Sequence, residues 1–194
     1  DASNRLREAA EMIIANLAEG IKPEDDPRLA HNMLEINNAG AQLRDDLHSK
    51  FTGLLRAGKK VGLIGGDHST PLGLIKALAD VHEEFGILQI DAHADLRMAY
   101  EGFTYSHASI MYNVLKEVPQ VRRLVQVGIR DYCDEELAII ENSGGRVVTF
   151  FDKTIKEQQY EGINWKSICL NIVKTLPQKV YISFDIDGLD PKLC

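Results

Sequence analysis

The chain has 194 residues, of which 44% are hydrophobic and 26% charged. This balance is typical of a globular domain and excludes disordered, collagen-like and low-complexity chains. The formal net charge of −7 argues against a nucleic-acid partner, because binding to polyphosphate requires a basic surface. Apolar runs fall far short of the roughly 20 residues that a membrane helix needs, so no membrane contact is expected. Three widely spaced cysteines predict reduced thiols and therefore a cytoplasmic protein.

Two amphipathic helices are predicted in residues 1–60, which we interpret as a helical lead-in. The first runs from Ser3, as N-cap, to Leu17 and carries its apolar residues on one face. The second begins at Asp26–Pro27, a typical N-cap and first helical position, and ends near Gly58. Within the second, the sequence Asn-Asn-Ala-Gly at 37–40 marks a point where the helix could be interrupted.

From residue 61 onward, short apolar runs alternate with helical patterns. The runs are rich in Val, Ile, Leu and Phe, as buried strands of parallel sheets are. They cover Val61–Gly66, Gly86–Asp91, Leu124–Ile129, Arg146–Phe151 and Val180–Asp185. The helical patterns cover Thr70–Phe85, His107–Lys116, Asp134–Asn142 and Trp165–Leu176. This order predicts a single α/β domain over residues 1–194, a three-layer α/β/α sandwich with a central, mainly parallel sheet whose core is formed by residues 61–194.

Aspartate and histidine residues concentrate in three segments that each follow a predicted strand. Their sequences are GGDHST at 65–70, DAHAD at 91–95 and SFDIDGLDP at 183–191. In open α/β sheets, ligands bind beyond the carboxyl ends of the strands. Asp91 and Asp185 end strands that should be buried, and a lone carboxylate there is costly unless it is paired or bound to a metal. These segments therefore predict a metal site.

Other acidic residues in the same segments have simpler interpretations. Asp67 and Ser69 are predicted to cap the helix that Pro71 begins. Asp190, directly before a proline, is interpreted as a turn former. The remaining acidic run at 131–136 is predicted to be solvated, as are three histidines on surface helices, His31, His48 and His82.

The candidate metal ligands are four carboxylates and two imidazoles, without a thiolate. Side chains two residues apart on an extended backbone point the same way, so ligands within one segment share a face. An oxygen-rich set with imidazoles favours a transition metal such as manganese. Four carboxylates balance two divalent ions, which predicts two metals bridged by Asp91 and Asp185 and a site suited to a cationic substrate. The predicted ligands are His68, Asp91, His93, Asp95, Asp185 and Asp187.

The three motifs, in this order, resemble those of the ureohydrolase family of arginases, agmatinases, guanidinobutyrases and formimidoylglutamases. The likeness extends from Val61 to the end of the chain, and all six family metal ligands match the residues given above. It implies an arginase-like fold, two Mn²⁺ per subunit, and assembly into homotrimers or hexamers. Family chains continue beyond the third motif to a glutamate that holds the guanidinium. We therefore expect this chain to be incomplete at both ends, with its substrate-binding residues unassigned.

The segment DLRMAYEGFTYSH at 95–107 resembles the agmatinase branch of the family. The likeness implies that His107 shuttles protons and that Asp95, besides ligating metal, hydrogen-bonds the attacking hydroxide and carries its proton. The intervening loop has no asparagine and is rich in apolar and aromatic residues, which suits the methylene stem of agmatine. Arg97 could pair with a substrate carboxylate, but a pair with Glu101, or exposure to solvent, is favoured.

The expected reaction is hydrolysis of a small cationic guanidino compound to urea and an amine. Agmatine, giving putrescine in polyamine biosynthesis, is the favoured substrate. Arginase, guanidinobutyrase and formimidoylglutamase activities remain alternatives within the family. A single-zinc deacetylase of the same fold is disfavoured because His68 would serve a second metal. A non-catalytic paralogue is disfavoured because no ligand has been lost.

Overall fold

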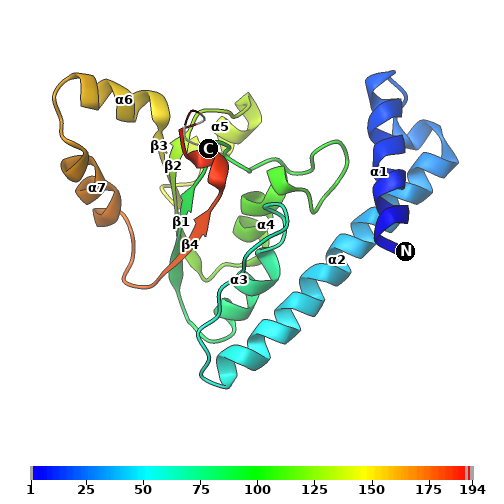
Figure 1. Ribbon diagram of the computed structural model, residues 1–194, viewed down its shortest axis with the longest axis horizontal. Coiled ribbons are helices and arrows are strands. Elements are labelled where there is room, and N and C mark those ends of the chain that lie inside the picture. Colours follow the sequence, from blue (N-terminus) through cyan, green and yellow to red (C-terminus); the bar gives the residue numbers. More distant parts are fainter. Residues whose placement is uncertain (1, 191, 193–194) are drawn as a thin grey trace.

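The computed structural model describes residues 2–190 and 192, which are built around a four-stranded parallel sheet (Figure 1). The strands are β1 (Phe85–Ile90), β2 (Val121–Ile129), β3 (Val147–Phe151) and β4 (Val180–Phe184). Their order across the sheet is β3-β2-β1-β4, and each neighbouring pair is parallel. Because β1 and β4 are parallel neighbours, the loops that follow them leave the sheet side by side, which is where two of the three motifs lie.

One face of the sheet is covered by α3 (Leu72–Ala79), α4 (Ile110–Glu117) and α5 (Asp134–Glu141). Alternate side chains of the strands point into this layer, and Ile87 and Leu124 have no exposed surface there. The residues of the cluster come from both helices and strands, so their burial holds sheet and helices together. Apolar burial of this kind contributes roughly 25 cal/mol per Å² to the stability of the fold.

The opposite face is covered by α6 (Asp152–Tyr160) and α7 (Trp165–Lys174) (Figure 1). Ile155 and Ile168 from these helices form a second core cluster with Val125 of β2. The sheet thus lies between two helical layers, which confirms the predicted α/β/α architecture. Within the described residues, no helix combines the length and hydropathy needed to cross a bilayer.

The N-terminal residues form two helices, α1 (Ala2–Ala18) and α2 (Pro27–Arg56), joined by a short 3₁₀ turn. Asp26 caps α2 by accepting a hydrogen bond from the backbone N–H of Arg28, as its position before Pro27 predicts. The far end of α2 packs against α3 through Phe51 and Leu74, whereas α1 packs on α2 away from the sheet (Figure 1). The 30 residues of α2 run without a break, so the possible interruption at 37–40 does not occur.

The strand predicted at Val61–Gly66 is not formed, and this prediction is wrong. The segment lies beside the outer edge of β4, where residues of both line two cavities, but within the described residues the two backbones form no ladder. The segment also ends in Gly65 and Gly66, whose φ values of +99° and +72° are left-handed. The side chains of Val61 and Leu63 pack against the cluster around Phe51 and Tyr181 instead.

Three smaller differences concern helices. The helix predicted over Thr70–Phe85 is shorter in the structure, where α3 ends at Ala79 and Phe85 is the first residue of β1. Asp67 accepts a hydrogen bond from the backbone N–H of Ser69 at 2.9 Å, an Asx turn in the loop, and does not cap α3. The sequence DKTIKEQQY does not predict the helix α6, because it contains one aliphatic residue, Ile155, and a single apolar position shows no helical periodicity.

Candidate metal centre

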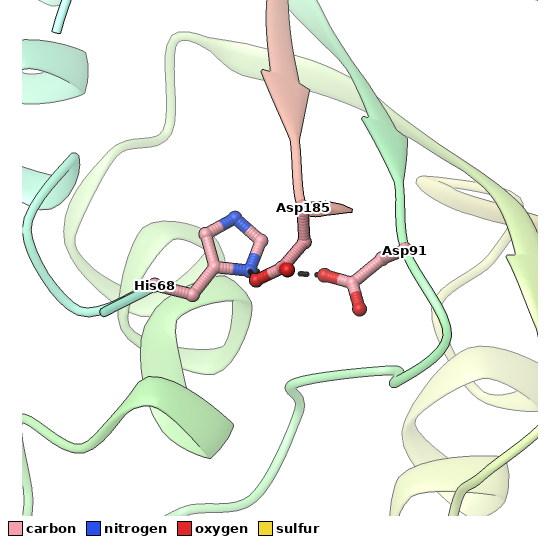
Figure 2. Close-up of side chains that lie close together, drawn as sticks. All are labelled: His68, Asp91 and Asp185. Carbon is pink, nitrogen blue, oxygen red and sulfur yellow. Dashed lines mark ion pairs between the residues drawn. The ribbon is translucent and has the colours of Figure 1, made fainter. Parts of the chain in front are cut away.

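Loops from three elements bring the predicted ligands together beyond the carboxyl ends of β1 and β4. His68 belongs to the loop before α3, Asp91 directly follows β1, and Asp185 directly follows β4. Figure 2 shows these three side chains pointing toward one another. A second group, formed by Asp91, His93 and Asp187, lies beside the first. Asp91 and Asp185, 94 positions apart in the sequence, thus meet because β1 and β4 are neighbours.

The first group is centred on the imidazole of His68. Its Nδ1 lies 2.9 Å from Asp91 Oδ2, 2.8 Å from Asp95 Oδ2 and 3.5 Å from Asp185 Oδ2. Among the described side chains, this buried Nδ1 has no hydrogen-bond partner of acceptable geometry. The other ring nitrogen, Nε2, lies 2.8 Å from Ser183 Oγ, which orients the ring. A buried imidazole nitrogen that faces three carboxylates fits a divalent cation well.

The second group shares Asp91 with the first. His93 Nδ1 lies 3.0 Å from Asp187 Oδ2 and 3.7 Å from Asp91 Oδ1. Asp91 therefore turns one carboxylate oxygen to each group, which is the arrangement a bridging ligand requires. Asp185 lies in the first group only, so its bridging role stays a prediction. The His93 side chain is 49% exposed, so the second group forms the more open side of the site.

Burial and close charges shift the pKa values of the ligands in opposite directions. Burial alone would lower the pKa of His68, but the carboxylates of Asp91 and Asp95 raise it to about 10. Burial raises the pKa of Asp95 to about 6. Burial also acts to raise the pKa of Asp91, but the adjacent His68 imidazole and hydrogen bonds from the His93 backbone and Gln89 lower it overall. The buried carboxylates need positive charge beside them, which a proton on His68 or a divalent cation can supply.

The turn after β4 fits closely against Asp91. This 3₁₀ turn spans Ile186–Gly188, and a Cβ on Gly188 would lie 2.8 Å from the backbone nitrogen of Asp91. A larger residue would push the two ligand loops apart, so the glycine of the third motif is a packing requirement. The backbone N–H of Ala92 donates to Asp187 Oδ1 at 3.1 Å, and Arg130 donates to the carbonyl of Asp187. These contacts lock the two loops together.

Asp95 reaches the site through an unusual backbone conformation. Its φ of +55° is left-handed, a region that few residues other than glycine, asparagine and aspartate adopt. The carbonyl of Asp95 accepts hydrogen bonds from the backbone N–H groups of Met111 and Tyr112, at 3.0 and 3.2 Å, in the first turn of α4. The start of α4 therefore holds the turn that aims the Asp95 carboxylate back at His68.

Both ligand groups open into one cavity of about 350 Å³. Its lining includes six carboxylates but a single guanidinium, that of Arg97. On one wall, the Arg97 guanidinium carbon lies 5.2 Å from the ring centroid of Tyr100, whose ring in turn meets that of His107 edge-on at 5.9 Å. His107 is exposed and lies in the cavity lining, close to but outside the two ligand groups.

Glu136 also lines the cavity, which its sequence position in an acidic run does not predict. The acidic run 131–136 was predicted to be solvated, but Glu136 is only 3% exposed. Its carboxylate accepts hydrogen bonds from the backbone N–H groups of Leu96 and Cys133, at 2.9 and 3.0 Å. Glu136 is the third residue of α5, the position at which a capping box places a glutamate, so the signal was present in the sequence.

The position of Arg97 agrees with one half of the prediction. No ion pair with Glu101 is found among the described residues, and the Arg97 Nε lies 3.7 Å from Glu136 Oε2 instead. The side chain is nevertheless 38% exposed, with its guanidinium over the Tyr100 ring.

A sequence model of the arginase family matches residues 1–194. The chain belongs to the arginase family. Among its relatives, N(1)-aminopropylagmatine ureohydrolase of Thermus thermophilus is 41% identical over 140 residues, which cover 72% of this chain and 43% of that protein. Agmatinase of Blochmanniella floridana is 30% identical over 151 residues, covering 76% and 44%. The chain thus spans less than half the length of these relatives.

Solved structures of the family have the same fold. The crystal structure of agmatine ureohydrolase of Thermoplasma volcanium matches with a TM-score of 0.64 and 26% identity, covering 79% of this chain and 48% of that one. The resemblance drawn from the three motifs is therefore confirmed, and the names of these relatives support the agmatinase side of the family.

Proposed function

We propose that this arginase-family chain forms the metal-binding part of an amidinohydrolase that releases urea from a linear guanidino compound. The observation that carries the proposal is the meeting of two ligand groups, joined by Asp91, in a cavity lined by six carboxylates. Such a cavity favours a cationic guanidinium and offers no ready site to an anion.

The residues present fit two Mn²⁺ ions, one in each ligand group. His68, Asp91, Asp95 and Asp185 would hold the first, and His93, Asp91 and Asp187 the second, with Asp185 as a further bridge. When bound, a pair of divalent ions lowers the pKa of water and supplies a nucleophile at neutral pH. The oxygen-rich ligand set, without thiolates, favours Mn²⁺ over Zn²⁺.

Two side chains would move protons in the reaction. Asp95 is buried with its carboxylate 2.8 Å from His68 Nδ1, beside the first ligand group, where it could accept a proton from the nucleophile and pass it on. His107 lies at the exposed side of the same cavity, where it could protonate the departing amine or exchange protons with solvent. A guanidinium is a poor electrophile with a poor leaving group, so the reaction needs both functions.

The cavity wall supports agmatine as the substrate. An arginine or guanidinobutyrate carboxylate would need fixed polar partners, and the cavity's single guanidinium, Arg97, already lies near Glu136 and over the Tyr100 ring. A carboxylate without a partner would lose its hydration without compensation, so such substrates should be rejected. The second candidate is N(1)-aminopropylagmatine, because the 41% identical relative carries that name and Asp131 adds a carboxylate for a further amine.

Other activities receive less support. A deacetylase with a single metal would leave His68 and its carboxylates without a role. A non-catalytic relative would not need the six ligands that remain. Assembly into trimers or hexamers, expected from the family resemblance, is proposed on that ground alone.

The decisive experiment combines metal analysis with a substrate panel on the purified enzyme. We expect two Mn²⁺ per subunit, and kcat/KM for agmatine or N(1)-aminopropylagmatine well above that for arginine, guanidinobutyrate and formimidoylglutamate. If arginine or guanidinobutyrate were the best substrate, the proposed substrate would be wrong but the ureohydrolase assignment would stand. If no guanidino compound released urea, the proposed activity would be wrong.

A further inference from the structure

A row of buried polar side chains crosses the sheet directly beneath the metal centre. On β1 and β2, Ile87 and Leu124 belong to the apolar core, but two residues further along each strand come Gln89 and Gln126. These glutamines are cross-strand neighbours with no exposed surface, and Thr149 of β3 lies opposite Gln126. Burying an amide is costly unless all its polar groups are hydrogen-bonded, so the row calls for an explanation.

The two amide groups form a directed chain of hydrogen bonds. The NH₂ group of Gln126 donates to Gln89 Oε1 at 2.8 Å and to the Ala94 carbonyl at 2.7 Å. Its Oε1 accepts from the hydroxyl of Thr149 at 2.8 Å. Because a backbone carbonyl can only accept, the Ala94 contact fixes which end of the Gln126 amide faces Gln89.

Gln89 extends this chain of hydrogen bonds to the metal ligands. Its NH₂ group donates to Asp91 Oδ2 at 2.8 Å and to the His93 carbonyl at 3.2 Å. Each glutamine thus uses both amide protons, and every acceptor outside the pair lies in the segment 91–95. That segment supplies three of the six candidate ligands. The Ala94 carbonyl held by Gln126 directly precedes Asp95, the residue with left-handed φ.

We propose that Gln126 is a positioning residue for the metal centre, which it controls through Gln89 and the Ala94 carbonyl without touching any ligand side chain. Because Gln89 Oε1 accepts a hydrogen bond from Gln126, the NH₂ group of Gln89 faces Asp91. This donor holds the Asp91 carboxylate in one orientation. The bond to the Ala94 carbonyl holds the backbone turn that aims Asp95. This inference rests on the proposed metal-dependent function.

The test measures Mn²⁺ binding to metal-free protein by isothermal titration calorimetry for wild type, Gln126→Met, Gln89→Met and the double variant. Loss of a residue that supports a metal ligand typically weakens binding by about 10- to 100-fold, and we expect about 10-fold for Gln126→Met. Since Gln126 acts in part through Gln89, the double variant should lose less than the product of the two single losses. An unchanged Kd in Gln126→Met, or a loss in the double variant equal to that product, overturns the proposal.

Ile87→Val is the matched control, because Ile87 is as buried as Gln89 and Gln126 and lies two residues before Gln89 on the same face of β1. It should lower the Tm of the metal-free protein while leaving the Kd for Mn²⁺ unchanged. If Gln126→Met fails to fold, Thr149→Val takes its place by removing only the hydroxyl that holds Gln126. It should weaken binding by about threefold, the worth of one hydrogen bond, and an unchanged Kd overturns the proposal.

The outcome also separates this inference from the proposed function. A wild-type protein that binds no Mn²⁺ overturns both. A wild-type protein that binds Mn²⁺ tightly, with the same Kd in the Gln126 and Thr149 variants, overturns the positioning role alone.

Discussion

At the scale of single residues, Asp91 links the two ligand groups, because one of its oxygens faces His68 and the other faces His93. Asp91→Asn keeps the shape of the side chain but removes its charge and turns an NH₂ group toward one metal. We therefore predict that Asp91→Asn and Asp185→Asn each lose both Mn²⁺ ions on dialysis, whereas His68→Asn loses chiefly one. Metal content by mass spectrometry measures this, and an Asp185→Asn protein that retained two ions would show that Asp185 does not bridge.

His107 offers a second prediction at the same scale, since it lines the cavity but lies outside both ligand groups. His107→Asn should retain both metals and lower kcat by about 10²- to 10⁴-fold, the usual loss when a general acid or base is removed. Loss of metal from His107→Asn would instead identify His107 as a ligand.

At the scale of elements, α2 holds the loop that forms the cavity wall. Asn37 donates to the Gly102 carbonyl at 3.1 Å and accepts from the Thr104 backbone N–H at 2.8 Å. Gly40 leaves room for Tyr105, whose Cβ would lie 2.9 Å from a Cβ at that position. The residues that suggested a break in the helix are thus those that bind the loop.

Removing the Asn37 contacts should loosen the wall and leave the metals in place. We predict that Asn37→Ala raises KM by about tenfold with unchanged metal content, since small displacements of positioning groups are costly to catalysis. Asn38→Ala, which changes an exposed neighbour on the same helix, is the control. Equal KM values in the two variants would show that the loop holds its shape without α2.

Hydrogen bonds to one carboxylate also link α2 to the end of α3. His48 Nε2 lies 2.7 Å from Asp80 Oδ2, and Thr52 donates to the same oxygen at 3.0 Å. Burial alone would raise the pKa of Asp80, but these two hydrogen bonds, aided by Arg56, lower it overall. A carboxyl whose pKa is lower in the folded protein stabilises it above the unfolded pKa, near 3.9, and loses this effect as pH falls through the folded value.

Asp80→Asn should therefore lower the free energy of unfolding at pH 7 by about 0.2–1 kcal/mol, the range for a largely exposed pair. The difference from wild type should shrink as pH falls below the unfolded pKa and through the lowered folded pKa, and vanish once Asp80 is protonated in both states. Urea unfolding at several pH values measures it, with Glu83→Gln, an exposed neighbour, as control. A difference independent of pH would mean that packing, and not charge, links α2 to α3.

At the scale of the whole molecule, α6 and α7 leave one side of the sheet uncovered along β4. Ile182 and Phe184 of this strand are 61% and 54% exposed, and the outer edge of β4 has no strand partner in the described sheet. Exposed apolar side chains on an unpaired edge promote association between chains.

We predict that the 194 residues, expressed alone, self-associate and that Ile182→Lys reduces this association. Light scattering coupled to size-exclusion chromatography provides the measurement. Leu34→Lys is the control, because Leu34 is 60% exposed but lies on α2, away from β4. If both lysine variants reduced association equally, general surface hydrophobicity and not the β4 strip would be responsible.

Helices and strands that are marked by nearby residues could be predicted from the sequence alone. Apolar runs ending in Asp predicted β1 and β4, and the Asp26–Pro27 pair predicted the start of α2. The ligands within DAHAD and DID could be predicted because each segment directly follows an apolar strand, although Asp95 has a left-handed φ and Asp187 lies in a 3₁₀ turn, so the extended backbone expected there does not occur. A carboxylate at the end of a buried strand also predicts a compensating positive charge nearby, because an unpaired buried charge is costly.

The tertiary structure decided whatever depends on a distant partner. Val61–Gly66 has the composition of a strand and lies beside the edge of β4, but within the described residues it forms no ladder with that edge, and composition alone does not supply such pairing. Gln89 and Gln126 read as isolated polar residues within apolar runs, and only the pairing of β1 with β2 makes them one hydrogen-bonded row. Sequence periodicity shows on which face of its own helix or strand a side chain lies. Which residues it contacts there depends on how the helices and strands pack together.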